Sequence, residues 1–201
     1  MILIVGGQHR KIGKTALIEA LVRRFPSVPW TAVKITTHHG PAGSEELRVL
    51  EETLPSPETD TGRYLAAGAA RAYLVQCAGG AVRDACEALR GAGILRGPVV
   101  IESGAAAEYL DPALFLFLAD ADPEAEAKES ARRRLSRADA FVVTAPRRPG
   151  PIYRLRLPAG RPRFYVRPPE FRSRPLIEFV AARLGLRAQP FSRPPGERVG
   201  P

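Results

Sequence analysis

GGQHRKIGKTALIEAL, residues 6–21, is the stretch that decides the fold predicted for this chain. It follows MILIV, a short apolar run that is typical of a buried parallel strand. From Ala16 onward, apolar residues recur at the spacing of an amphipathic helix. The residues GGQHRKIGKT are therefore predicted to form a strand-to-helix turn, in which backbone N–H groups point at a bound anion.

The end of this turn fits the phosphate-loop pattern G-x-x-x-x-G-K-[ST]. We expect Lys14 to reach the β- and γ-phosphates and the Thr15 hydroxyl to ligate Mg²⁺. The first glycine of the pattern falls on Gln8, which suits a variant loop if the φ angle of this residue is negative. The alternative is an ordinary turn that happens to contain GKT. The predicted nucleotide-binding residues are Gly7, Gln8, His9, Arg10, Lys11, Ile12, Gly13, Lys14, Thr15 and Ala16.

The composition is that of a soluble, enzyme-like protein. A length of 201 residues makes one domain the default expectation. No run approaches the roughly 20 apolar residues that span a bilayer, and the first residues lack the features of a signal peptide, so we expect a cytoplasmic protein without a membrane partner. Two cysteines, Cys77 and Cys86, fit neither a disulfide framework nor a metal site and are expected to be buried apolar residues.

Charge divides the chain into two parts. Residues 147–201 contain 13 arginines, no lysine and three acids, which gives a charge of +10. Because the whole chain carries +9, residues 1–146 carry −1. We therefore predict a nucleotide-binding domain over residues 1–146 and a basic, Pro/Arg-rich C-terminal extension over residues 147–201, packed on the same domain.

Strands and helices are predicted to alternate along the chain. The predicted strands are residues 1–5, 30–36, 73–77, 98–104, 114–120, 140–145 and 163–168. The predicted helices are residues 16–25, 62–72, 81–93, 124–137 and 174–185, with one short helical piece at 45–52. This alternation predicts an α/β fold with a doubly wound, mainly parallel sheet of the P-loop NTPase type.

Two carboxylates are expected to meet the phosphate loop, because ligands bind at the carboxyl ends of parallel strands. Glu102 directly follows the apolar run VVI, and Asp60 lies in the long polar stretch after the second predicted strand. With Thr15, both are predicted to ligate Mg²⁺, and with Lys14 both are the predicted catalytic residues. The alternatives are an ion pair for Glu102 and a helix N-cap role for Asp60.

Four segments together resemble the molybdopterin-guanine dinucleotide biosynthesis protein B family: GKT, VKITTHHG, DTGRYLAAGAA and VVIESG. The resemblance covers roughly residues 1–104. It implies a GTP-binding P-loop protein, often dimeric, that assists attachment of GMP to molybdopterin. The residues that match the family are Lys34, His38, His39, Asp60, Thr61, Arg63, Ala67, Gly68, Ala69 and Glu102, whereas Gln8 and Ser103 depart from it.

The sequence does not determine which base the nucleotide carries. A guanine-reading [NT]-K-x-D motif is absent, and TAPRRPG at residues 144–150 stands where such a motif often lies. Three function classes follow: a GTP-binding accessory protein or slow GTPase of the molybdopterin type, an ATP-dependent small-molecule kinase or ligase, and a nucleic-acid-binding module. One of the adjacent histidines, His38 or His39, is a candidate contact for phosphate or substrate.

The arginine-rich extension favours a protein partner over nucleic acid. Glu170 and Glu178 interrupt its positive charge, and the apolar residues of 174–185 commit that helix to burial. Few aromatic residues are interleaved with its arginines, as a base-stacking platform would require. We expect the helix to pack on the sheet edge and the arginines to meet an acidic protein surface or a second copy of the chain.

Overall fold

The computed structural model describes residues 1–38, 47–78, 80–120, 133–144, 157–168 and 170–190. Its strands are β1 (Ile2–Gly7), β2 (Thr31–His38), β3 (Arg48–Glu52), β4 (Arg71–Ala78), β5 (Val99–Glu102), β6 (Leu114–Asp120), β7 (Ala140–Thr144) and β8 (Arg163–Val166). Its helices are α1 (Lys14–Arg24), α2 (Asp60–Ala66), α3 (Val82–Gly91), the short 3₁₀ helix η1 (Ala105–Glu108) and α5 (Arg174–Leu184).

All these strands form one sheet in the order β3-β4-β2-β5-β1-β6-β7-β8. Every neighbouring pair is parallel except β3 and β4, which run antiparallel. The first strand lies inside the sheet, between β5 and β6, so its residues from Leu3 to Val5 are fully buried. The sheet confirms the prediction of a mainly parallel α/β fold, and the turn after β1 opens at the edge where parallel strands end.

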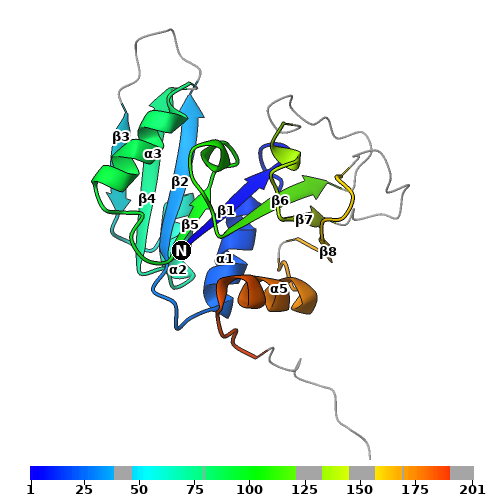
Figure 1. Cartoon of the computed structure of the whole chain (residues 1–201). Helices are drawn as coiled ribbons and strands as arrows, with labels where there is room; N and C mark the ends of the chain where they lie inside the picture. The colour runs from blue at the N-terminus through cyan, green and yellow to red at the C-terminus, as the bar shows by residue number, and fades with distance from the viewer. Residues whose placement is uncertain (39–46, 79, 121–132, 145–156, 169, 191–201) are drawn as a thin grey trace, which may run out of the picture.

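Helices cover both faces of the sheet, which makes it doubly wound (Figure 1). One apolar cluster joins α1, α2 and α5 to the sheet, and a second joins α3 and η1 to the opposite face. The strand residues alternate between the two clusters: Leu3 and Val5 of β1 belong to the first, and Ile4 to the second. This alternation follows from the period of two in a strand and gives each face its own core.

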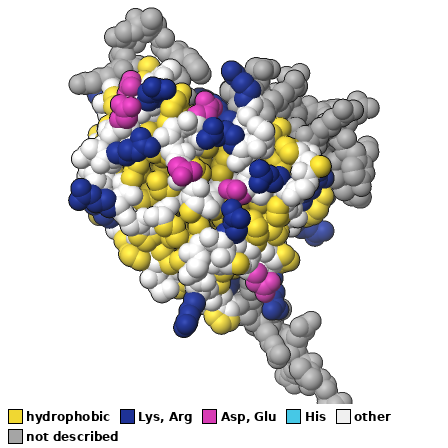
Figure 2. All heavy atoms as spheres, in the orientation of Figure 1, with side chains coloured by type: hydrophobic (Ala, Val, Ile, Leu, Met, Phe, Trp, Pro, Cys, Tyr) yellow, Lys and Arg dark blue, Asp and Glu magenta, His cyan; other side chains and the backbone are white. Residues whose placement is uncertain are grey.

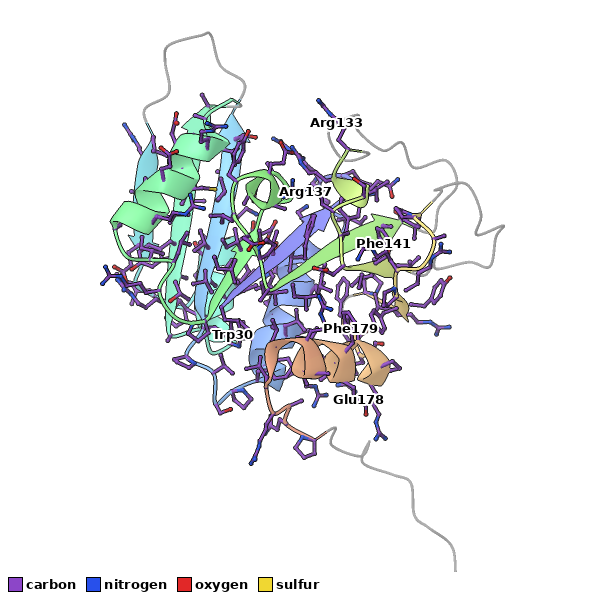
Figure 3. All side chains as sticks on the ribbon, in the orientation of Figure 1. Trp30, Arg133, Arg137, Phe141, Glu178 and Phe179 are labelled. Carbon is purple, nitrogen blue, oxygen red and sulfur yellow. The ribbon has the colours of Figure 1, made fainter. Side chains whose placement is uncertain are left out.

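The C-terminal helix α5 lies on a face of the sheet rather than beside its edge, where we had expected it. Its buried residues Leu176, Ile177 and Val180 belong to the cluster that contains α1. Phe179 points toward the sheet, 5.1 Å from Phe164 of β8 between ring centroids, and Glu178 points away from it (Figure 3). The edge itself is formed by β8, which pairs in parallel with β7. Strand β8 thus belongs to the same sheet as the first part of the chain, and α5 belongs to the same core.

Two predicted elements are wrong in type or extent. Residues 45–52 do not form a helical piece within the described part, because residues 48–52 form strand β3 on β4. The helix predicted over 62–72 ends at Ala66, since Gly68 adopts a left-handed φ of 106° and the next strand begins at Arg71. Most of the helix predicted over 124–137 lies outside the described residues.

Three further features bear on the predictions about compartment and surface. No described helix combines the length and the apolar character that crossing a bilayer requires. Cys77 and Cys86 are buried free thiols, and burial raises the pKa of Cys86 to about 11. On the described part of the face drawn in Figure 2, basic and acidic side chains are interspersed rather than gathered by sign.

Candidate functional site

Gln8 begins the turn between β1 and α1, at the position where the phosphate-loop pattern has its first glycine. Its backbone N–H donates to the Leu118 carbonyl at 3.0 Å, and its side-chain Oε1 accepts from the Asp120 N–H at 3.0 Å. Among the described residues other than glycine, only Lys11 and Phe171 have positive φ. Gln8 therefore needs no glycine-like backbone, and it extends the pairing of β1 with β6 by one residue.

Gly13 is required at the end of the turn for two reasons. Its φ of 104° lies in the region that favours glycine, and it directly precedes α1. A Cβ atom at this position would stand 2.5 Å from the Cζ atom of Phe171. Phe171 is buried, comes from the segment between β8 and α5, and has a positive φ of 47°. The C-terminal part of the chain thus packs directly against the turn, a contact that the sequence did not reveal.

Lys14 begins α1 and turns its side chain back over the loop. Its Nζ atom donates to the His9 carbonyl at 3.3 Å. Burial lowers the pKa of Lys14, and the nearby Glu102 carboxylate partly opposes this shift. The His9 ring is held in turn, with Nδ1 2.6 Å from the Arg10 carbonyl oxygen and Nε2 3.4 Å from an Asp120 carboxylate oxygen. An anion placed in the loop would meet this ammonium group and the N-terminus of α1.

Thr15, the second residue of α1, donates its hydroxyl to the Oε2 atom of Glu102 at 2.8 Å. Glu102 ends β5 beside β1, and its side chain is only 7% exposed. The buried Tyr64 of α2 donates its hydroxyl to the same oxygen, and burial, followed by the Glu102 charge, raises the pKa of Tyr64. The Glu102 carboxylate is therefore fixed by two hydroxyl groups from different helices.

Lys34 of β2 joins the two predicted catalytic carboxylates. Its Nζ atom donates to Asp60 and lies 3.4 Å from the Oε1 atom of Glu102. Partial burial would raise the pKa of Asp60, but the hydrogen bond and charge of Lys34 outweigh it and lower that pKa, with Thr15 contributing in the same direction. The structure thus brings Thr15, Lys34, Asp60 and Glu102 together at the N-terminus of α1.

Asp60 is held from the other side by α2 and α1. It is the first residue of α2, and the N-cap is Thr59, whose hydroxyl accepts from the Gly62 N–H at 3.0 Å. The alternative of an N-cap role for Asp60 is therefore wrong. Arg63 lies 3.7 Å from the Asp60 carboxylate and also pairs with Glu19 of α1, which is nearly buried. This pair anchors the first turn of α2 to the helix that follows the loop.

The oxygen atoms of this cluster suit a hard cation that arrives with a nucleotide. A hydroxyl and two carboxylates are groups that Mg²⁺ accepts. No set of three or more His, Cys, Asp or Glu side chains that could hold a metal occurs among the residues described. In the structure, the Lys34 ammonium group takes the position between Asp60 and Glu102, so a metal ion there would have to displace it. Such a site would need phosphate oxygens to complete the coordination of Mg²⁺.

Several candidate residues lie outside the described part or have undescribed side chains. His38 ends β2, but its side chain is not described, and His39 lies outside the described residues. The same holds for residues 145–150, where the sequence lacks a guanine-reading motif. Of the residues that the sequence did not identify, Tyr64 and Phe171 make the closest contacts to the site.

Comparison with known proteins supports the fold. No family model matches the chain, and no curated protein matches it. Among solved structures, it is similar to the crystal structure of the "apo" form of LpxK from Aquifex aeolicus in complex with ATP, with a TM-score of 0.50 and 16% sequence identity. The match covers 82% of this chain and 53% of the LpxK chain, so this chain spans about half the length of that protein. At this identity, the match supports the P-loop NTPase type of fold.

Proposed function

We propose that this chain binds a nucleoside triphosphate with Mg²⁺ through residues 7–16 and acts on its terminal phosphate with Glu102 and Asp60. The observation that carries the proposal is the 2.8 Å hydrogen bond from Thr15 to Glu102 at the N-terminus of α1. It fixes the hydroxyl that follows the phosphate-loop lysine, so that a lone pair of its oxygen is left for a cation. The carboxylate that fixes it comes from the strand next to β1.

In this proposal, the residues of the cluster hold the phosphates, the metal ion and the attacking group. The Lys14 ammonium and the N–H groups of the loop hold the β- and γ-phosphates. Thr15, together with Asp60 and Glu102, would hold Mg²⁺, which when bound neutralises charge on the phosphates. Tyr64 keeps the Glu102 carboxylate in place, and Glu102 orients the water or acceptor hydroxyl that attacks. If a cation occupied the position between the two carboxylates, Lys34 would no longer pair with Asp60 and would be free to contact the terminal phosphate.

The more specific proposal is a GTP-binding accessory protein, or slow GTPase, of molybdopterin-guanine dinucleotide biosynthesis. The segments that carry this resemblance are far apart in the sequence, but their polar residues meet in one cluster. Thr15 comes from the first segment, Lys34 from the second, Asp60 from the third and Glu102 from the fourth. This convergence supports a shared site in which all four segments serve one ligand.

An ATP-dependent small-molecule kinase or ligase is the second candidate. The structural neighbour LpxK was crystallised with ATP, and its likeness extends over 82% of this chain. In this case Glu102 would face the hydroxyl or carboxylate of an acceptor instead of water. The two candidates make the same use of Lys14 and Thr15, and they differ in the base that is bound and in the acceptor.

The test is calorimetric titration of the chain with GTP and with ATP in the presence of Mg²⁺, together with thermal unfolding. We expect micromolar binding of one of them and a stabilisation that follows RT ln(1 + [L]/Kd). Lys14→Ala should remove both signals. Arg96→Ala is the matched control, because Arg96 is exposed in the turn before β5, at the opposite end of that strand from Glu102. Nucleotide stabilisation of Lys14→Ala equal to that of the wild type would refute the proposal.

A further inference from the structure

An open pocket lies in the C-terminal part of the chain and has no role in the site described so far. Its volume is about 510 Å³, and it is lined by Tyr165, Arg167, Glu170 and Arg172. Tyr165 is 57% exposed, which is high for an aromatic side chain at the end of a strand. Within the described residues, none of these four side chains makes a hydrogen bond or ion pair with another. On the described part of the chain, all four side chains are exposed, so their polar groups and the tyrosine ring can meet a ligand there.

The segment that carries the pocket residues contacts the phosphate loop through Phe171. Glu170 and Arg172 flank Phe171, whose ring packs against Gly13. The Phe171 N–H donates to the Arg167 carbonyl at 3.1 Å, which closes the turn that carries the pocket residues. Neighbouring Cα atoms are about 3.8 Å apart, so the Cα atoms of residues 170 and 172 each lie about that far from the Cα atom of Phe171, whose side chain touches the loop.

The position of the pocket in the sheet indicates which part of a nucleotide it meets. Lys34, Asp60 and Glu102 approach the loop from β2, α2 and β5, on one side of β1. The pocket follows β8, on the other side of β1, and β8 runs parallel to β7, so its carboxyl end lies at the ligand-binding edge. With the terminal phosphate on the carboxylate side, the nucleoside extends toward β6, β7 and β8.

We propose that this pocket binds the guanine base of the nucleotide, with Glu170 as the residue that distinguishes guanine from adenine. This inference rests on the proposed function, because it assumes that the phosphates occupy residues 7–16. Guanine presents two N–H donors on its Watson–Crick edge, and a carboxylate accepts from both. Adenine presents an acceptor and a donor there, so a carboxylate would face a lone pair.

The other pocket residues fit a flat aromatic ligand. The Tyr165 ring and the guanidinium planes of Arg167 and Arg172 stack on bases without regard to their identity. In this arrangement, Tyr165 provides affinity for any purine, whereas Glu170 provides selectivity. The carboxylate thus takes the place of the acidic residue of the [NT]-K-x-D motif, which this sequence lacks.

The experiment compares GTP, ATP and xanthosine triphosphate by titration calorimetry on the full chain with Mg²⁺. Xanthine has a carbonyl group where guanine has an amino group, so an amide side chain suits it and a carboxylate does not. We expect the wild type to prefer GTP. Glu170→Gln should weaken GTP binding about 10- to 100-fold, which is the scale of one bidentate base contact. The variant protein should bind xanthosine triphosphate more tightly than GTP. Tyr165→Ala should weaken the binding of all three nucleotides by a similar factor.

Glu178→Gln is the matched control, because Glu178 lies on α5, points away from the sheet and pairs with Arg174. It should leave the preference for GTP unchanged. A wild type that prefers ATP, or a Glu170→Gln variant that keeps the preference for GTP, would overturn the base assignment. If Glu170→Gln instead tightened all three nucleotides equally, the pocket would bind phosphate, which would also overturn it. A wild type that binds none of the three would refute the proposed function as well, whereas loss of selectivity alone would not.

Discussion

Replacement of Lys34 by methionine tests whether one ammonium group holds two carboxylates together until a metal replaces it. Methionine is unbranched, as lysine is, but it carries no charge. In the wild type, the Lys34, Asp60 and Glu102 side chains are 23%, 32% and 7% exposed. Their interaction therefore lies between that of a surface ion pair, about 0–1 kcal/mol, and that of a buried one, about 3–5 kcal/mol.

The expected loss of stability follows from this intermediate burial. A hydrogen bond to a charged group contributes about 1.5–3 kcal/mol, and Lys34 makes one close contact to Asp60 and a longer one, 3.4 Å, to Glu102. We expect Lys34→Met to lower the free energy of unfolding by about 1.5–3 kcal/mol. For a protein of this size, 1 kcal/mol changes Tm by about 2–4 °C, so Tm should fall by roughly 3–12 °C.

The effect of Mg²⁺ on the stability of the same variant is the stronger test. With the ammonium group removed, Asp60 and Glu102 face each other without the cation that lay between them, and Mg²⁺ alone should restore part of the lost stability. Mg²⁺ should change the wild type less, since Lys34 competes for the same carboxylates. Thermal and urea unfolding at neutral pH, with and without millimolar Mg²⁺, measure both effects. Arg96→Met is the control, because Arg96 is exposed in the turn before β5 and should give a change within about 0.5 kcal/mol.

Two results would refute this reasoning about Lys34. One is a loss of stability in Lys34→Met no larger than that of Arg96→Met, which would mean that the contacts to the carboxylates contribute nothing measurable. The other is an equal response of wild type and variant to Mg²⁺. In that case the ammonium group and the metal would not share a position, and the fit of Asp60 and Glu102 to Mg²⁺ would fail.

The remaining predictions concern the loop and its neighbours. Bound phosphates need a charged Lys14, and burial lowers the pKa of this residue, so nucleotide affinity should fall as the pH rises toward that lowered pKa. The affinity of Lys14→Arg should not change over the same pH range, because arginine stays charged. Calorimetry across alkaline pH checks this, and a flat wild-type profile would contradict it. Glu102→Gln should reduce turnover by orders of magnitude and change nucleotide affinity only a few-fold, and a fully active variant would exclude the catalytic role. Gly13→Ala should cost at least about 1–3 kcal/mol in urea unfolding, since it combines a φ of 104° with a contact to Phe171, and a neutral substitution would show that the turn relaxes.

The interior of the fold was predictable from the sequence, because its strands are apolar on both faces. The run LFLFLAD, predicted as a strand over residues 114–120, forms β6 over those residues, and six of the seven are buried. The helix predicted over 174–185 forms α5, from a serine N-cap to a left-handed glycine C-cap. In both segments, local pattern and tertiary packing favour the same structure, which is the condition under which sequence patterns are most informative.

The edge of the sheet was not predictable, because its structure depends on a partner strand. Residues 48–52 carry exposed and half-buried side chains, and the surrounding Leu and Glu residues favour a helix locally. They form β3 because Val49 faces Val75 and Leu50 faces Leu74 across the antiparallel pair with β4. Strand propensity at an edge is mostly the packing of such pairs, and no local window contains both members of a pair.

The site was predictable where chemistry follows a motif or the end of a strand. Lys14 and Thr15 follow from the loop pattern, and Glu102 follows from its place after an apolar run. Tyr64 was missed because a buried aromatic residue in a helix is ordinary, and only its contact to Glu102 gives it a role. Phe171 was missed because it is 158 residues from Gly13 in the sequence and lies in a proline-rich segment without helical or strand periodicity.

The basic charge of the extension has a different meaning once its arginines are placed. Arg174 pairs with Glu178, and Arg183 lies 3.3 Å from Asp139, so these two charges are balanced within the chain. Arg167 and Arg172 instead line the pocket proposed for the base. In the proposed arrangement, the guanidinium groups of these two arginines stack on the base of a nucleotide held by residues 7–16. Since Phe171 packs against Gly13 between them, we propose that the pocket residues around Phe171 form part of the nucleotide site.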